Sequence, residues 1–306
     1  MKIKGWALQD AWMTKLADWL ALCPMSETNP GGVAAVGSLL ATELDHLGFT
    51  VHRIQNPSGR EGSTVLAAVR RPSPGVRTWV GLCGHWDVET TSPLEWASDP
   101  LVPTIRDRRV YCRGVGDNLG PLLQRLLVLA SMPEDAPCPG LFWVLHGEEE
   151  TGNGFPHQVF PTLYAKFPNL KDSIALWMDE TGYFEANGDQ RLLVVQNHNR
   201  ELMRKVVAAV ETSAHADDGG RQVHVVERFL NKELGGKTCP YRRFLFGPQV
   251  DYVALGMNDV LTNIHRPNES VPLDTLAVSA TQFAKVLAVV AAHNEDGQVV
   301  MPATVG

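Results

Sequence analysis

The sequence predicts an α/β protein with a mostly parallel, mixed sheet flanked by helices on both faces. Strand-like apolar segments alternate with segments of helical periodicity along the 306 residues. This alternation is typical of parallel strands, which need long connections that are usually helical. Hydrophobic residues make up 44% of the chain and charged residues 20%, as expected for a large globular core. No internal repeat or low-complexity linker divides the chain, so we predict a single domain over 1–306.

The first part of the chain predicts two helices and three strands. Residues 6–22 place tryptophans and leucines at helical spacing on one side, which indicates packing against a core. Residues 33–48 repeat this pattern and end at Gly48, a residue typical of helix C-termini. Three strands are predicted at 49–54, 63–69 and 78–84.

The remainder continues the alternation of helices and strands. Helices are predicted at 121–132, 200–211 and 273–293, and strands at 141–147, 173–179, 191–196 and 251–256. Residues 212–248 have no clear pattern.

Composition and charge exclude several classes of protein. The net charge is −7 and no long basic run occurs, which disfavours nucleic-acid binding. We expect no membrane-spanning segment, and charged residues interrupt the apolar core that an N-terminal signal peptide would need. The five cysteines are odd in number and have no CxxC spacing, so we expect reduced thiols and a cytoplasmic protein.

Polar side chains lie after or beside several of the predicted strands. They are His85 and Asp87 in GHWD, Asp117 in the glycine-rich GVGDNLG, Glu149 and Glu150 in HGEEETG, Asp179 in WMDE, and His265 in IHRPNE. Taken singly, each has an ordinary explanation as a turn residue or a solvated charge. Taken together they are notable, because sites in open α/β sheets form at the carboxyl ends of strands.

Two imidazoles and three carboxylates of this kind can hold two divalent ions, with one carboxylate shared between them. Zinc is the default for such ligands, and manganese or cobalt could use the same ones. Glu149 is then a spare carboxylate that fits a general base. Asp87 lies two residues beyond His85 and fits the partner that orients its ring.

The motifs resemble those of the M20 family of metallopeptidases, which includes glutamate carboxypeptidases, aminoacylases, desuccinylases and carnosinase-like dipeptidases. GHWDV is similar to the H-x-D motif of the family, and 96–121 resembles its W-x-x-D-P … D-x-K-G run. GEEETG, MDE and IHRPNE resemble its remaining site motifs, and the N-terminal residues from NPGG to FTV are also similar. An M28-type aminopeptidase is the nearest alternative, but the W-x-x-D-P run favours M20.

The resemblance implies a role for each site residue. Asp117 would bridge the two metal ions, His85 and Asp179 would complete one ion, and Glu150 and His265 the other. Glu149 would be the general base and Asp87 the partner of His85. The implied fold is the zinc-peptidase catalytic domain.

The chain departs from the family pattern in three places. Leu119 replaces the usual lysine of D-x-K-G, and Cys112 replaces a usual glycine. Only 86 residues separate Asp179 from His265, too few for the lid domain that the family normally inserts there. We therefore expect the lid and dimerisation insertion to be missing, or reduced to a remnant within 186–248.

A lid of this family supplies groups that bind the oxyanion and the substrate. SAHADDGG faintly resembles the corresponding lid segment, which makes His215 a candidate oxyanion donor, although a polar loop after a helix is the favoured explanation. Arg200 and Arg221 are further candidates for substrate contact.

The expected reaction is metal-assisted hydrolysis of an amide bond in a small peptide or an N-acyl amino acid. Without a lid the cleft should be more open, so it could accept a bulkier substrate or need a homo-oligomer or a partner protein to close it. Two other classes remain open: a non-hydrolytic, acyl-transfer type of biosynthetic enzyme, and a non-catalytic binding protein on an M20 scaffold. Glu149 argues against the last, because a binding protein needs no base.

Overall fold

The computed structural model describes residues 6–55, 64–151, 161–163, 165–168, 170–180, 182–196, 198–215, 220–227 and 251–293. Its helices are α1 (Gln9–Leu20), α2 (Pro30–His46), the 3-10 helix η1 (Pro93–Glu95), α3 (Leu119–Ser131), α5 (Leu170–Ser173), α6 (Arg200–His215) and α8 (Leu273–Ala292). Its strands are β1 (Thr50–Gln55), β2 (Thr64–Arg70), β3 (Trp79–His85), β4 (Thr104–Arg106), β5 (Arg109–Tyr111), β6 (Gly140–His146), β7 (Ile174–Asp179), β8 (Tyr183–Phe184), β9 (Gln190–Val195), β10 (Val223–Glu227), β11 (Tyr252–Ala254), β12 (Asn258–Asp259) and β13 (Ser270–Pro272).

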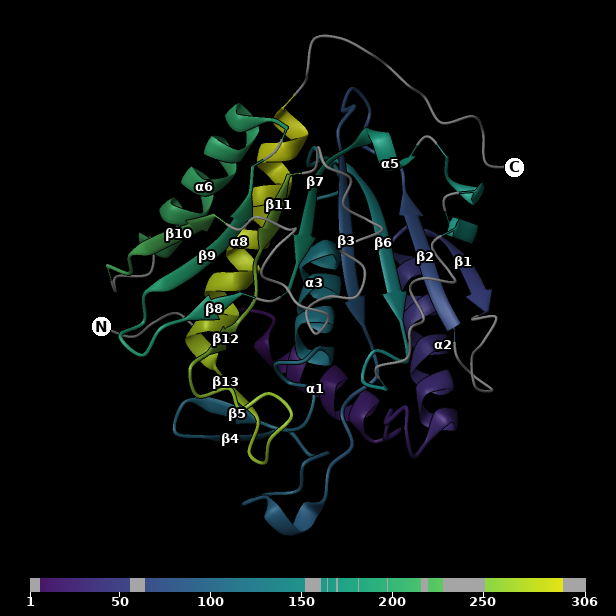
Figure 1. Cartoon of the computed structure of the whole chain (residues 1–306), viewed down its shortest axis with the longest axis vertical. Coiled ribbons are helices and arrows are strands. Elements are labelled where there is room, and N and C mark those ends of the chain that lie inside the picture. Colours follow the sequence, from purple (N-terminus) through teal and green to yellow (C-terminus); the bar gives the residue numbers. More distant parts are fainter. Residues whose placement is uncertain are drawn as a thin grey trace.

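A mixed sheet forms the centre of the molecule (Figure 1). The described strands follow the order β1-β2-β6-β3-β7-β11-β9-β8-β12, and β10 pairs with β9. The four central strands β6, β3, β7 and β11 are mutually parallel, so their carboxyl ends share one edge of the sheet. The predicted mixed sheet with a parallel centre is confirmed.

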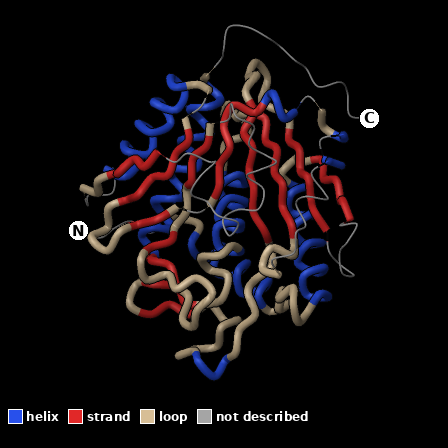
Figure 2. Tube along the Cα trace, viewed as in Figure 1, coloured by secondary structure: helices blue, strands red, loops and turns tan. Residues whose placement is uncertain are grey.

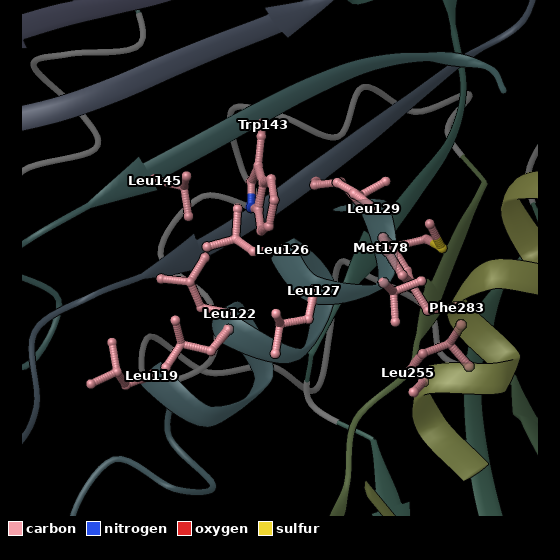
Figure 3. Close-up of a cluster of buried hydrophobic side chains, with 14 of the residues drawn as sticks. Leu119, Leu122, Leu126, Leu127, Leu129, Trp143, Leu145, Met178, Leu255 and Phe283 are labelled. Atoms are coloured by element: carbon pink, nitrogen blue, oxygen red, sulfur yellow. The ribbon is translucent and has the colours of Figure 1, made fainter. Parts of the chain in front are cut away.

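One face of the sheet carries the long helices, which lie behind the strands in Figure 2. Side chains of α1, α2, α3, α6 and α8 pack with alternate residues of the central strands into one apolar cluster. Leu126 of α3 lies next to Trp143 of β6 in this cluster (Figure 3). Alternate strand residues face opposite sides of a sheet, so this cluster takes only one of each pair.

The other face of the sheet has a smaller apolar cover. Leu163, Phe167 and Leu170 pack there against Trp177 and other strand residues. A side chain at Gly81 would bring its Cβ within 2.4 Å of the Trp177 ring, so glycine at this position gives the tryptophan its space. The predicted helices on both faces are therefore present but unequal, with the short helix α5 on the lightly covered face.

A second, three-stranded sheet lies below the first in Figure 1, in the order β13-β5-β4. Its strands are three residues each. Antiparallel pairing of β13 with β5 places Ser270 opposite Tyr111. This pairing brings residues just before α8 next to the segment that leads to α3.

Every predicted helix and strand has a counterpart, with ends shifted by a few residues. The prediction missed the short strands β4, β5, β8, β10, β12 and β13. Within the region expected to hold a lid remnant, β9 and β10 are strands of the main sheet, and α6 packs into the apolar cluster on that sheet. Residues 228–250 lie outside the described part of the chain, so the prediction of a missing lid stays a prediction.

One helix is long and apolar enough to cross a membrane by length and composition, contrary to the sequence expectation. It is α8, whose most apolar 18-residue stretch is 67% buried inside the protein. α8 packs against α3 and α6, as a core helix does. Among the described cysteines, Cys23, Cys83, Cys112 and Cys138 are present as thiols, as predicted.

Candidate metal centre

The predicted site residues gather at the carboxyl edge of the central parallel strands. β3 ends at His85, β6 at His146 and β7 at Asp179. β3 and β6 pair in register, so that His85 lies opposite His146. The backbone after β3 and β6 leaves the sheet at this edge and carries the acidic residues of the HWDVE and HGEEE segments.

Asp117 lies in the loop between β5 and α3, and its carboxylate lies between two histidines. Oδ1 is 3.0 Å from Nε2 of His85, and Oδ2 is 3.2 Å from Nε2 of His265. Nε2 of His265 is also 2.9 Å from Oε2 of Glu150. Four of the five predicted metal ligands therefore form one continuous set, with Asp117 in the bridging place.

Asp87 holds both the imidazole of His85 and the acidic loop. Its Oδ1 is 3.1 Å from Nδ1 of His85 and accepts the backbone N–H of Glu149 at 3.2 Å. Its Oδ2 accepts the backbone N–H of Glu150 at 3.1 Å. The Asp87 side chain is fully buried. This arrangement directs Nε2 of His85 toward Asp117, as expected for a partner of a ligand histidine.

Burial and charge shift the proton affinities of the cluster in opposite directions. Burial raises the pKa of Glu150 and of Glu149. Burial alone would also raise the pKa of Asp117, but hydrogen bonds from His265 and His85 hold it below its ordinary value. Hydrogen bonds to Asp117 and Glu150 raise the pKa of His265. The carboxylates around His85 and His265 thus favour positive charge between them.

Three buried carboxylate oxygens at this edge lack hydrogen bonds within the described part of the chain. They are Oε2 of Glu148, Oε1 of Glu150 and Oε2 of Glu180. A buried carboxylate oxygen without a donor is costly unless a cation balances it. Two groups of side chains at this edge have donor atoms that all lie within 4.8 Å of one another. One group is His85, Asp117 and Glu150, and the other is Glu89, Glu150 and His265. These residues fit a divalent metal centre.

Asp179, the fifth predicted ligand, is bonded within the sheet. Its Oδ2 accepts the hydroxyl of Tyr252 on β11 at 2.9 Å, and its Oδ1 accepts the backbone N–H of Glu180 at 2.6 Å. The next residue, Glu180, accepts a hydrogen bond from the side-chain amide of Asn118, the neighbour of Asp117. Glu180 is thereby tied to the Asp117 loop, and Asp179 is not.

Arg125 and Glu180 form a buried pair of opposite charges on this side of the site. Nη1 of Arg125, on α3, is 3.8 Å from Oε2 of Glu180. Burial raises the pKa of Glu180, with further contributions from Asp179 in the same direction and from Arg125 in the opposite one.

Of the three candidate substrate residues, Arg221 and Arg200 lie away from this set, and the side chain of His215 lies outside the described part of the chain. Arg221 pairs with Asp274 at the start of α8 and donates to the carbonyl of Gly188. Arg200 is exposed at the start of α6, after β9, which runs antiparallel to β11 and so ends at the opposite edge of the sheet. His215 ends α6, and its side chain lies outside the described part of the chain.

Sequence reasoning gave no role to Glu89, Glu180 or Glu269. Glu269 is fully buried and accepts hydrogen bonds from the Arg113 side chain and from the backbone N–H groups of Gly114, Gly116 and Asp117. In the sequence, Glu269 is the last residue of IHRPNE, the motif that already drew attention to His265. The signal for Glu180 was its place directly after the last residue of a strand.

No protein-family model matches the chain. The chain is 43% identical over 82 residues to the succinyl-diaminopimelate desuccinylase of Cupriavidus pinatubonensis, which is 26% of this chain and 21% of that protein. It is 34% identical over 126 residues to the enzyme of the same name from Verminephrobacter eiseniae, or 37% of this chain and 31% of that protein. The matched segments span between about a fifth and a third of these curated relatives.

Solved structures match nearly the whole chain. The M20 family metallo-carboxypeptidase Sso-CP2 of Sulfolobus solfataricus has a TM-score of 0.69 at 13% identity, covering 92% of this chain and 99% of that one. The dipeptidase Dug1p of Saccharomyces cerevisiae has a TM-score of 0.72 at 12% identity, covering 94% and 97%. Human carnosine dipeptidase 1 has a TM-score of 0.69 at 12% identity, covering 93% and 96%. The resemblance read from the motifs is thus confirmed: the chain has the fold of M20 metallopeptidases and is similar in sequence to succinyl-diaminopimelate desuccinylases.

Proposed function

We propose that this chain is a metal-dependent hydrolase that cleaves an amide bond in an N-acyl amino acid or a small peptide. The observation that carries the proposal is the set formed by His85, Asp117, Glu150 and His265, in which a buried Glu150 oxygen has no hydrogen-bond donor. The desuccinylase and dipeptidase names of the similar proteins support the same reaction class.

We propose two divalent ions in this set, with zinc the default and manganese or cobalt as alternatives. Asp117 would bridge them, with His85 on one ion and Glu150 with His265 on the other. For the remaining carboxylate we propose Glu180 instead of Asp179. Oε2 of Glu180 has no hydrogen bond and only the 3.8 Å ion pair with Arg125, and the Glu180 side chain contacts the Asp117 loop. Both oxygens of Asp179 accept hydrogen bonds. When bound, the ions would polarise the scissile carbonyl and acidify the attacking water.

Glu149 is the proposed general base. Asp87 fixes its backbone N–H, and burial raises the pKa of its carboxyl, which favours accepting a proton. It would take a proton from the attacking water and deliver it to the leaving amine nitrogen. Asp87 would keep His85 in the orientation and tautomer that leave Nε2 facing the site.

The test is a hydrolysis assay with zinc, manganese or cobalt added. N-succinyl and N-acetyl amino acids and dipeptides are the substrates, and release of free amine is measured. We expect turnover of at least one substrate, and a loss of about 10²–10⁴-fold in Glu149→Gln with metal still bound. Metal-bound protein that cleaves none of these substrates would contradict the proposal. So would a Glu149→Gln variant that retains full activity.

A further inference from the structure

Glu89 lies four residues after His85, on the segment that leaves β3. The backbone of this segment is fixed on both sides, because Val88 donates its N–H to the carbonyl of Pro24 at 2.9 Å and Asp87 holds the acidic loop. Oε1 of Glu89 accepts the N–H of Thr90 at 2.8 Å. This contact leaves Oε2 available to the site.

The carboxylate of Glu89 lies beside two of the proposed ligands. Donor atoms of Glu89, Glu150 and His265 are within 4.8 Å of one another. Donors that bind one ion at about 2.1 Å lie about 3.0–4.2 Å from one another. Nε2 of His265 and Oε2 of Glu150 are already 2.9 Å apart. A rotation of the Glu89 side chain that brings its oxygen about 1–2 Å closer would therefore place all three donors on one ion.

The negative charges of Glu89 and Glu150 also favour a cation at this point. The Glu150 side chain is 4% exposed, and its Oε1 has no hydrogen-bond partner in the described structure. None of the described lysines and arginines forms an ion pair with Glu89. The donor atoms of Glu89 and Glu150 thus lie within 4.8 Å of each other, and His265 is the basic side chain of this group.

We propose that Glu89 is an additional ligand of the second ion, the one assigned to Asp117, Glu150 and His265; this inference rests on the proposed metal centre. The second ion then has three carboxylates and one imidazole, and the first has His85 and two carboxylates. Oxygen-rich sets suit manganese better than zinc. The two positions are therefore unequal, and the second is the one that takes manganese.

The experiment is a titration of metal-free, full-length protein with manganese, followed by isothermal calorimetry and by the electron paramagnetic resonance signal of free manganese. Glu89→Gln removes the charge but keeps the length of the side chain and an oxygen for the N–H of Thr90. Glu95→Gln, at an exposed glutamate of η1, is the matched control. Circular dichroism verifies that the variants are folded.

In wild type and Glu95→Gln we expect two bound ions. In Glu89→Gln we expect one site to lose at least tenfold in manganese affinity while the other is unchanged. Two unaltered sites in Glu89→Gln, or a single ion in wild type, would overturn the role of Glu89 and leave a metal-dependent function standing. A wild-type protein that binds neither manganese nor zinc would overturn the proposed function as well.

Discussion

The backbone N–H of Asp117 donates a 3.1 Å hydrogen bond to Oε1 of Glu269, 152 residues further along the chain. The same carboxylate accepts from the N–H groups of Gly114 and Gly116 and from the guanidinium of Arg113. Four donors thus converge on one fully buried carboxylate, which fixes the loop that presents Asp117.

Glu269→Gln should destabilise the protein and disorder this loop. The amide group would place N–H donors against backbone N–H donors and leave the buried Arg113 without its counter-charge. Breaking a buried pair of this kind costs about 3–5 kcal/mol. Urea denaturation of the metal-free protein measures the change, with Glu95→Gln as a control that should stay within about 0.5 kcal/mol of wild type. A loss below 1 kcal/mol would contradict the role given to Glu269.

Asp87→Asn should weaken metal binding without removing a ligand. The two carboxylate oxygens of Asp87 together accept three N–H groups, from His85, Glu149 and Glu150. An asparagine has only one acceptor oxygen, so it cannot hold both the imidazole and the backbone of Glu150 in place. Losing an outer-shell partner typically costs about 10–100-fold in metal affinity. Competition with a chelator of known affinity measures it. The exposed Asp45→Asn on α2 is the control, and equal affinities in the two variants would refute this prediction.

Glu180→Gln and Asp179→Asn separate two adjacent carboxylates. We expect Glu180→Gln to retain about one ion, because it removes a charged ligand. Asp179→Asn should retain two, because an amide oxygen can still accept the hydroxyl of Tyr252. Metal content per chain, measured by mass spectrometry on proteins purified side by side without chelator, gives the answer. The reverse pattern would restore Asp179 as the ligand.

Metal removal should lower the thermal stability of the protein. A ligand that binds only the folded state stabilises it by about 2.7 kcal/mol at a concentration of 100 times its dissociation constant. Wild type should therefore melt at a lower temperature after exhaustive chelation and recover when zinc is added. Asp117→Ala should contain little metal and show little response, because it lacks the bridging carboxylate. An identical zinc response in both proteins would exclude Asp117 as the bridge.

The sequence indicated most residues of this candidate centre because polar and charged side chains follow the buried strands β3, β6 and β7, and because Asp117 and His265 lie in recognisable motifs of the loops. It could not distinguish Asp179 from Glu180, since the choice depends on where β7 ends and on the hydroxyl of Tyr252 from another strand. Glu269 was hidden for a similar reason: its four donors come from residues more than 150 positions away. Strands such as β4 and β13 escaped prediction because three residues are too few to show a period.

The pairing of β13 with β5 has a consequence for how the protein is made. His265 and Glu269 come late in the chain, whereas His85, Asp117 and Glu150 come in its first half. During synthesis the N-terminal ligands emerge from the ribosome first, and their loop lacks its anchor until β13 has docked. Tight metal capture should therefore follow translation of the segment up to β13, which would make metal uptake a late event in biogenesis.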